Sequence, residues 1–207
     1  MRYLIPEGVE VEPVIRRQAD LPFQPRRELR SVAGQRGVAR AARQAPGRGP
    51  APVHLWRPAH CGDIDIVIRR DGVWMHEGSP IGRTELVRLF STILRKDPDG
   101  YHLVTPGEKM RIEVEDLPFR ATTVERRGAT LVFTTDVGDE VAADLDHPIM
   151  VETNAVTGEP QPAVRVRGDL WARIARPVFY ELVEMAEVSP EGLIVRSAGT
   201  TFRLGEA

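Results

Sequence analysis

The chain has 207 residues, of which 42% are hydrophobic, and its formal net charge is −2 at pH 7. These values are ordinary for a soluble globular protein of one large or two small domains. No apolar run approaches the roughly 18 residues of a membrane span, and the N-terminus lacks the pattern of a secretory signal. The one cysteine, Cys61, excludes an internal disulfide framework. We therefore expect a cytoplasmic protein without membrane contact.

Residues 1–53 differ from the rest of the chain in charge. They carry ten Arg and five acidic residues, a net charge of +5, whereas residues 54–207 carry a net charge of −7. Between residues 21 and 53 the composition is dominated by Arg, Ala, Gly, Gln and Pro without hydrophobic periodicity, which predicts a disordered basic tail. Clustered Arg residues can bind phosphates, but Phe23 is the only aromatic residue there for base stacking, so we do not expect nucleic-acid binding.

The strong preference for Arg gives the tail a third interpretation. The chain holds 28 basic residues, of which only Lys96 and Lys109 are lysines, and this bias is typical of a GC-rich coding sequence. An upstream start codon that is miscalled in such a sequence adds an extension rich in Arg, Ala, Gly and Pro. On this hypothesis much of residues 1–50 is dispensable or is not made.

From residue 54 onward the pattern is mostly β. Apolar residues alternate over 64–68, and an Asp71-Gly72 turn leads to a return strand over 73–76. The next apolar positions, from Leu86 to Leu94, follow the i, i+3, i+4, i+7 spacing of a helix with one buried stripe. Further strands are predicted at 101–105, 109–114, 121–125, 130–134 and 141–144.

The second half of the chain looks like a repeat of the first. Strands at 149–152 and 163–167 are followed by a predicted helix that begins at Asp169 and is interrupted at Pro177. Two more strands follow, at 193–197 and 200–204. The predicted fold is therefore α+β, mostly antiparallel β with two or three helices, and it contains a duplicated β-β-α-β-β core. The predicted parts are the tail 1–53, an N-terminal half 54–144 and a C-terminal half 145–207.

A series of motifs supports a resemblance to a known family. They are His54-x-Trp56, Cys61-Gly62-x-Ile64-Asp65, Asp71-Gly72-x-Trp74, Pro80-Ile81-Gly82-Arg83, Leu86 to Phe90, Leu103-Val104-Thr105-Pro106, Glu108-Lys109, Val114-Glu115-Asp116, Pro118-Phe119 and His147-Pro148. On these motifs, residues 54–204 resemble the uncharacterised bacterial family called domain of unknown function 1285.

The resemblance implies a mixed α/β fold with a duplicated core and a C-terminal half similar to pleckstrin-homology-like barrels. It also implies a ligand site between the halves and a part in signalling, without an established activity. The chain departs from the family pattern at Gly107, at Met75-His76 and in the hairpin around Arg196, which affects the expected shape of the pocket.

Four residues of the first half are candidates for holding a ligand. Arg83 follows a Pro80-Ile81-Gly82 turn at a helix start, where free amides and a guanidinium can bind an anion. Thr105, Glu108 and Lys109 flank a turn and offer a hydroxyl, a carboxylate and an ammonium group. A surface ion pair at Arg83 and a solvated hairpin tip are the structural alternatives.

Two further candidates are Trp56, which could stack on a ring, and Arg167, which could face the first half from the second. The alternatives are a core indole and a solvent-facing arginine. Arg165 shares the strand face of Arg167 by alternation and has the same two interpretations.

The sequence contains no complete catalytic constellation. His60 and Cys61 are neighbours in an extended segment, so their side chains point to opposite faces and do not form a dyad. The possible metal ligands His54, His60, Asp63, Asp65 and His76 lack the spacing of a zinc site. We therefore expect no catalytic residue, no metal and no cofactor.

The prediction for function is a non-catalytic cytoplasmic protein with a part in signalling. It binds a small anionic ligand, such as a nucleotide, between its halves and reports this to a protein partner. One alternative is a metal-dependent hydrolase that uses Asp63 or Asp65. The other is a protein-interaction module without a small ligand, which an extended apolar patch would favour.

Overall fold

The computed structural model describes residues 49–206, so the predicted tail lies almost entirely outside the described residues. In chain order the elements are η1 (Val53–Leu55), β1 (His60–Ile68), β2 (Trp74–His76), β3 (Ser79–Pro80), α2 (Thr84–Thr92), β4 (Leu94–Asp97), β5 (Gly100–Val104), β6 (Lys109–Val114), β7 (Phe119–Arg127), β8 (Thr130–Thr135), β9 (Glu140–Ala142), β10 (Ile149–Thr153), β11 (Pro160–Arg167), β12 (Leu170–Ile174), α3 (Arg176–Glu184), β13 (Glu187–Ser189), β14 (Gly192–Ser197) and β15 (Thr200–Gly205). The described chain is mostly β with two α-helices, as expected.

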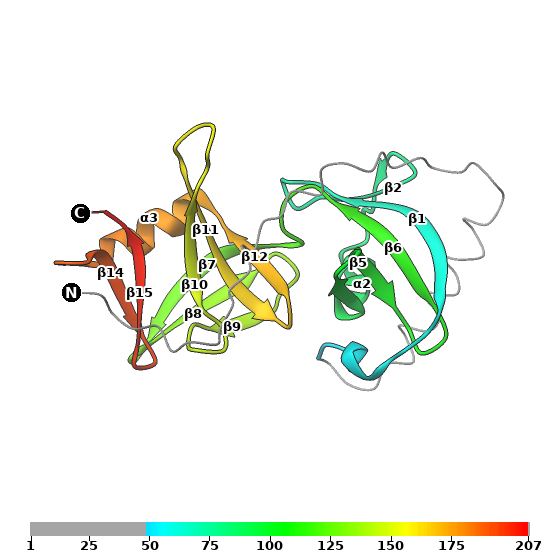
Figure 1. Cartoon of the computed structure of the whole chain (residues 1–207), viewed down its shortest axis with the longest axis horizontal. Coiled ribbons are helices and arrows are strands. Elements are labelled where there is room, and N and C mark those ends of the chain that lie inside the picture. Colours follow the sequence, from blue (N-terminus) through cyan, green and yellow to red (C-terminus); the bar gives the residue numbers. More distant parts are fainter. Residues whose placement is uncertain (1–48, 207) are drawn as a thin grey trace.

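The N-terminal half is a six-stranded sheet in the order β3-β2-β1-β6-β5-β4 that curls around α2 (Figure 1). Its central strands β1 and β6 are parallel, and the other pairs are antiparallel. The predicted alternation in β1 is confirmed, because Ile64, Ile66 and Ile68 are buried and point to one face. On that side the Trp74 ring stacks on Phe90 of α2, with 6.4 Å between centroids.

Helix α2 ends earlier than predicted. The sequence pattern extended it to Leu94, but α2 stops at Thr92, and Leu94 begins β4, where it pairs with Leu103 of β5. Asp97 and Gly100 close this β4–β5 hairpin rather than ending the helix. The helical spacing of apolar residues included Leu94 because this side chain is buried, and a buried leucine fits the pattern equally well in a helix or at the start of β4.

The C-terminal half contains a second six-stranded sheet, in the order β10-β11-β12-β7-β8-β9. Its central strands β7 and β12 are parallel, and a three-stranded sheet of β13, β14 and β15 follows α3. The buried Ser197 attaches this small sheet to the large one: its hydroxyl accepts a hydrogen bond from the Leu131 amide (2.8 Å) and donates one to the Ala143 carbonyl (2.6 Å).

The predicted helix at Asp169 is wrong. Residues 170–174 form strand β12, in which Leu170, Ala172 and Ile174 are buried in alternation. Helix α3 begins only at Arg176, with Pro177 in its first turn. A proline is favoured there because its missing amide would have no intrahelical partner, so Pro177 starts this helix and does not interrupt it.

The two six-stranded sheets repeat one topology. Each consists of two three-stranded meanders, and the first and last strands of the unit lie side by side in parallel at the centre. A duplicated architecture is therefore consistent with the structure, but its register differs from the prediction: β1 corresponds to β7, and not to residues 149–152. The segment 81–90 includes most of α2, whereas the segment 166–175 that was matched to it forms the β11–β12 turn and β12.

The sheets divide the chain between Val114, the end of β6, and Phe119, the start of β7, and the boundary predicted after residue 144 falls between β9 and β10 of one sheet. The expected likeness of the second half to pleckstrin-homology-like barrels stays a prediction. Neither α-helix of the described residues is long and apolar enough to cross a membrane.

Candidate functional site

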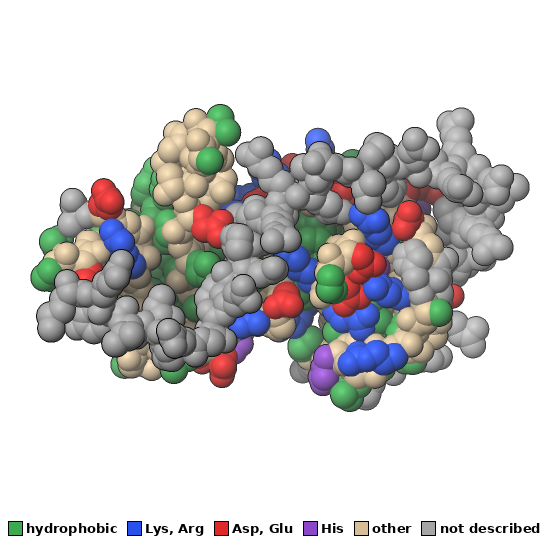
Figure 2. Space-filling view, in the orientation of Figure 1, with side chains coloured by type: hydrophobic (Ala, Val, Ile, Leu, Met, Phe, Trp, Pro, Cys, Tyr) green, Lys and Arg blue, Asp and Glu red, His purple; other side chains and the backbone are tan. Residues whose placement is uncertain are grey.

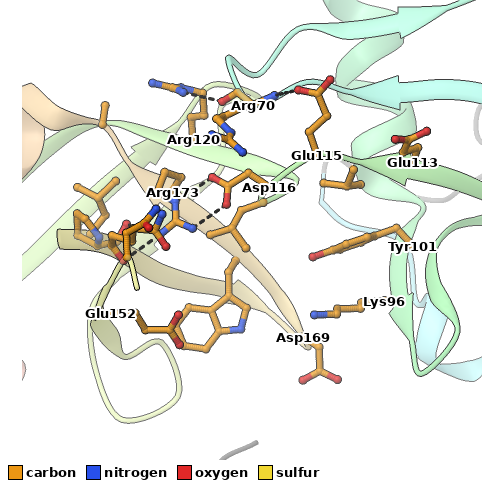
Figure 3. A pocket seen from close by; sticks show the side chains of 18 of the residues that line it. Arg70, Lys96, Tyr101, Glu113, Glu115, Asp116, Arg120, Glu152, Asp169 and Arg173 are labelled. Atoms are coloured by element: carbon orange, nitrogen blue, oxygen red, sulfur yellow. Dashed lines mark hydrogen bonds and ion pairs between the residues drawn. The ribbon is translucent and has the colours of Figure 1, made fainter. Parts of the chain in front are cut away.

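A groove of about 1890 Å³ runs between the two halves (Figure 3). Its walls are the second meander of each sheet, β4–β6 on one side and β10–β12 on the other, together with the first turns of α3. Pockets for small molecules usually measure about 300–1,000 Å³. The groove is therefore large enough for more than one small ligand or for an extended chain segment.

Three arginines lie at one end of the groove, which we call the arginine end: Arg70 and Arg120 line the groove itself, and Arg69 lines the recess beside it. Arg69 and Arg70 lie in the β1–β2 turn and Arg120 on β7, and with Asp71 and Glu115 they line a recess of about 360 Å³. Among the described residues, no carboxylate lies within ion-pair distance of these three guanidinium groups.

The two carboxylates of the recess are held by backbone amides. A Glu115 carboxylate oxygen accepts a hydrogen bond from the Arg70 amide at 2.9 Å, and Asp71 accepts one from the Val73 amide at 3.0 Å. Arg120 donates from Nη1 to the Arg70 carbonyl at 2.8 Å, which links the two halves and leaves its other guanidinium donors available (Figure 3). The recess can therefore offer several cationic donors to one anion.

The halves approach closely beside this recess. Gly72 has a φ of +87°, and a Cβ there would lie 2.8 Å from the Arg120 side chain and from Asp136. Burial raises the pKa of Asp136, whose carboxylate accepts a hydrogen bond from the Arg120 amide at 3.1 Å. A glycine is therefore required at the predicted turn, both for its backbone conformation and for the contact between the halves.

The middle of the groove holds a bidentate ion pair between Asp116, in the connection between the halves, and Arg173 on β12. Arg173 donates from Nε and Nη2 to the two carboxylate oxygens, at 2.9 and 2.7 Å. Arg173 also donates to the Gln161 carbonyl at 2.9 Å. This network fixes the connection against the second sheet and separates the two ends of the groove.

Both halves also line the groove beyond this pair, with Tyr101 and Lys96 from the first half and Glu152 and Asp169 from the second (Figure 3). Burial, followed by the charges of Asp116 and Asp169, raises the pKa of Tyr101 to about 12, so its phenol is neutral. The Lys96 ammonium lies 5.4 Å from the centre of the Tyr101 ring. The aromatic residues Trp171, Phe179 and Tyr180 also line the groove.

The ligand candidates of the first half lie outside the groove. Arg83 is exposed as the residue before α2. Thr105 is buried, and its hydroxyl accepts a hydrogen bond from the Glu108 amide at 3.0 Å within the β5–β6 turn. Trp56 is half-buried and packs against the core. The structure brings Thr105, Glu108 and Lys109 together as expected, but it does not join them to Arg83 or Trp56.

Lys109 belongs to a polar cluster at the β4–β5 turn. Its ammonium lies 2.7 Å from Asp97 and 3.5 Å from Asp99, beside the buried His102. Burial and then the Lys109 charge lower the pKa of His102. Burial raises the pKa of Asp97, but hydrogen bonds from Arg95 and Lys109 outweigh this effect and hold that pKa below its usual value.

Among the described residues, this cluster has a geometry that could hold a metal ion, because ligand atoms of Asp97, Asp99 and His102 lie within 4.8 Å of one another. The Lys109 ammonium and the Arg95 guanidinium already balance the two carboxylates, so the contacts form an ion-pair network. The sequence-predicted metal candidates Asp63 and Asp65 lie on β1 and do not belong to the cluster.

Arg167 faces the first half, as predicted, but at a contact between the halves away from the groove. Its guanidinium pairs with Asp139 and donates from Nη2 to the Ser91 carbonyl of α2 at 2.6 Å. It also lies 4.9 Å from the centre of the Phe119 ring. Arg167 therefore attaches α2 to the second sheet. Its neighbour in alternation, Arg165, pairs with Asp169 at 3.4 Å.

Sequence reasoning missed the residues that line both ends of the groove. The adjacent pair Arg69-Arg70 before the Asp71-Gly72 turn was a readable signal of a cationic hairpin tip. No local pattern could place Arg120 beside them, or Glu152 opposite Tyr101. Those positions depend on pairing between strands far apart in sequence.

Two family models match the chain. The N-terminal domain of "Domain of unknown function (DUF1285)" matches residues 51–117, and the C-terminal domain of "Protein of unknown function (DUF1285)" matches residues 118–204. The boundary between them coincides with the division of the sheets. A search of curated proteins gave no match.

Two solved structures are similar. A DUF1285 family protein from Silicibacter pomeroyi DSS-3 is 45% identical, with a TM-score of 0.75, over 82% of this chain and 95% of that chain. A DUF1285 family protein from Shewanella baltica OS155 is 25% identical, with a TM-score of 0.47, over 57% of this chain and 90% of that chain.

Proposed function

The chain belongs to the DUF1285 family, whose function is unknown, and we propose that it is a non-catalytic protein that binds a small anionic ligand between its halves. The ligand, of which a nucleotide is one example, binds at the arginine end of the groove. This moves the proposed site from Arg83 and Lys109 to Arg69, Arg70 and Arg120. The protein acts in the cytoplasm and reports the bound ligand to a protein partner.

The observation that carries this proposal is a recess lined by three arginines, none of which has a carboxylate ion-pair partner among the described residues. The two carboxylates of the recess accept hydrogen bonds from backbone amides, so the guanidinium donors stay available, and guanidinium groups bind phosphate or carboxylate through two donors at once. Because Arg70 and Arg120 come from different halves, a ligand there contacts both. Such a ligand can change how the halves are held, which is what a signalling role requires.

Exposed apolar side chains give the partner a place to bind. Val156, at the tip of the β10–β11 hairpin, is 80% exposed, and Tyr180, at the rim of the groove, is 57% exposed. Figure 2 shows the exposed apolar tip of this hairpin. Tyr180 lines the groove, and so does Ala155, the neighbour of Val156, so a partner that binds these side chains would be close to the groove.

The proposal is tested by titration calorimetry of the full chain with inorganic pyrophosphate and with ATP. Hydrogen bonds to charged groups contribute about 1.5–3 kcal/mol, and about 1.4 kcal/mol corresponds to tenfold in affinity. We therefore expect Arg70→Gln or Arg120→Gln to weaken binding about 10- to 100-fold. Arg83→Gln is the matched control, because it removes an exposed arginine outside the groove.

Binding that is lost in the Arg83 variant and kept in the other two would place the site where the sequence alone suggested it. No heat and no thermal stabilisation with either compound would refute the anion site. Thermal unfolding of each variant shows whether the loss of the hydrogen bond from Arg120 to the Arg70 carbonyl has changed the fold instead of the site.

A further inference from the structure

Glu115 holds a carboxylate at the recess of the arginine end without a counter-charge. Its amide donates to the Ile68 carbonyl at the end of β1 at 3.0 Å, and its side chain accepts a hydrogen bond from the Arg70 amide at 2.9 Å. These contacts fix the carboxylate where the recess joins the groove, because Glu115 lines both. Among the described residues, no guanidinium or ammonium group lies within ion-pair distance of it.

The other carboxylate of the recess has a structural role. Asp71 accepts a hydrogen bond from the Val73 amide at 3.0 Å, and this contact closes the β1–β2 turn. Glu115 comes from the end of β6 and reaches the turn from outside it. One of its carboxylate oxygens has no hydrogen-bond partner among the described residues, so Glu115 can accept hydrogen bonds from a ligand.

A carboxylate in an anion site restricts which anions bind there. Two like charges 4 Å apart repel each other by about 1 kcal/mol in water and by about 4 kcal/mol near a protein surface. A ligand made only of phosphate groups is therefore attracted by the three arginines and repelled by Glu115. A ligand that also presents a hydrogen-bond donor to Glu115 replaces the repulsion with a charge-assisted hydrogen bond.

The surrounding charges favour one kind of donor. An ammonium group would be attracted by Glu115 but repelled by the three arginines of the recess. Hydroxyl groups are neutral and avoid this repulsion, and two neighbouring hydroxyls can donate to one carboxylate. The recess of about 360 Å³ is at the small end of the usual range for ligand pockets, which suits one sugar phosphate unit.

We propose that Glu115 selects a phosphate ester of a sugar, such as a nucleotide. The three arginines of the recess bind the phosphate, and the Glu115 carboxylate accepts hydrogen bonds from two neighbouring hydroxyl groups of the sugar. The arginines then supply affinity for any phosphate, and Glu115 determines which phosphates bind well. This inference rests on the proposed anion site and adds the chemical class of its ligand.

The test compares ATP with 2′,3′-dideoxy-ATP, which has the same phosphates and base but lacks both ribose hydroxyls. Titration calorimetry of the full chain should give an affinity for ATP about 10- to 100-fold higher. The reason is that hydrogen bonds to a charged group contribute about 1.5–3 kcal/mol, and about 1.4 kcal/mol corresponds to tenfold. This comparison uses the unaltered protein, so it does not depend on the folding of a variant.

Glu115→Gln removes the charge and keeps an oxygen for the Arg70 amide. The ratio of the two affinities should fall at least about fivefold, because hydrogen bonds between neutral groups contribute less. The affinity for pyrophosphate should rise about two- to fivefold, because a repulsive charge is removed. Glu113→Gln is the matched control: Glu113 lines the groove but not the recess, so the ratio should not change.

Equal affinities for ATP and 2′,3′-dideoxy-ATP, with pyrophosphate still bound, would overturn this inference and leave the anion site intact. A ratio that Glu115→Gln does not change would show that the hydroxyl groups are bound by other residues. Tighter binding of phosphoethanolamine than of ribose 5-phosphate would make the donor an ammonium group and would also overturn it. If none of the three compounds bound, pyrophosphate included, the anion site itself would be refuted.

Discussion

The first hairpin of each sheet carries two arginines at its turn, and the two pairs have different surroundings. In the β1–β2 turn, Arg70 has no carboxylate within ion-pair distance among the described residues. In the topologically equivalent β7–β8 hairpin, Arg127 pairs with Glu125 at 3.0 Å and with Glu140 at 2.9 Å. The duplicated topology supplies an arginine at both places, but only the first hairpin leaves it available to a ligand.

The comparison extends to the groove itself. Its two walls are equivalent meanders, and each ends in a central strand, β6 or β12. The β4–β5 turn is short, whereas residues 154–159 form a longer tip between β10 and β11. Equivalent hairpins of the two walls therefore differ in length as well as in which of their charges are paired.

The largest effect is expected at the Asp116–Arg173 pair, whose side chains are 17% and 12% exposed. Asp116→Ala leaves a guanidinium without its carboxylate in a mostly buried position, which we expect to cost about 3 kcal/mol in the free energy of unfolding. Urea denaturation measures this value. The control is Glu187→Ala, which removes the partner of Arg196 in a pair that is about 60% exposed, and should cost less than about 1 kcal/mol. Equal costs would show that burial does not distinguish these pairs.

Alkaline pH should act next most strongly, through Tyr101. Its pKa is about 12 in the folded protein against 10.0 for the ordinary group, so the unfolded chain loses this proton first as the pH rises. The stabilisation is complete below pH 10 and is lost between about pH 10 and 12, an effect of about 2 to 3 kcal/mol. Urea denaturation across this range should show a smaller loss for Tyr101→Phe. An identical loss in both proteins would refute the role of Tyr101.

The second half differs from the first in carrying the additional three-stranded sheet, and substitution of Ser197 tests how strongly this sheet is attached. Ser197→Ala leaves the buried Leu131 amide without its acceptor, and we expect a cost of about 2 kcal/mol. Ser189→Ala is the matched control: this hydroxyl closes a half-buried turn in the same sheet, where water can replace it, so we expect less than about 1 kcal/mol. Equal melting temperatures of the two variants in thermal unfolding would contradict the prediction.

The sequence predicted most strands correctly because their signal is local. Ile64, Ile66 and Ile68 alternate, and this pattern determines β1 whatever lies beside it. The β12 strand was missed because both of its faces are buried: Trp171 lies on the face opposite to Leu170, so alternation was hidden and the run resembled a helix. Pro177 was interpreted as a break for the same reason, although it starts α3.

The sequence predicted a ligand site between two halves, and that a ligand binds there stays a prediction. A groove lies between the halves, but it is lined by residues other than Arg83, Lys109 or Trp56. Sequence spacing shows which residues share a turn, as Thr105 and Glu108 do. Sequence spacing does not show that β6 and β12 face each other. The position of each strand depends on a parallel pair at the centre of its sheet, β1 with β6 and β7 with β12, and each pair joins strands about 50 residues apart.

The smallest effect is expected at Arg127. It carries the same charge as Arg70 and lies at the equivalent hairpin, but it is held by Glu125 and Glu140. Arg127→Gln should therefore leave the affinity for pyrophosphate unchanged within about twofold, whereas Arg70→Gln should lower it at least about tenfold. Titration calorimetry at one ionic strength compares the two, because each variant removes one positive charge and long-range attraction falls equally in both. If Arg127→Gln weakens binding as much as Arg70→Gln, the anion is attracted only by the net charge of the protein, and the recess lined by Arg69, Arg70 and Arg120 is not a binding site.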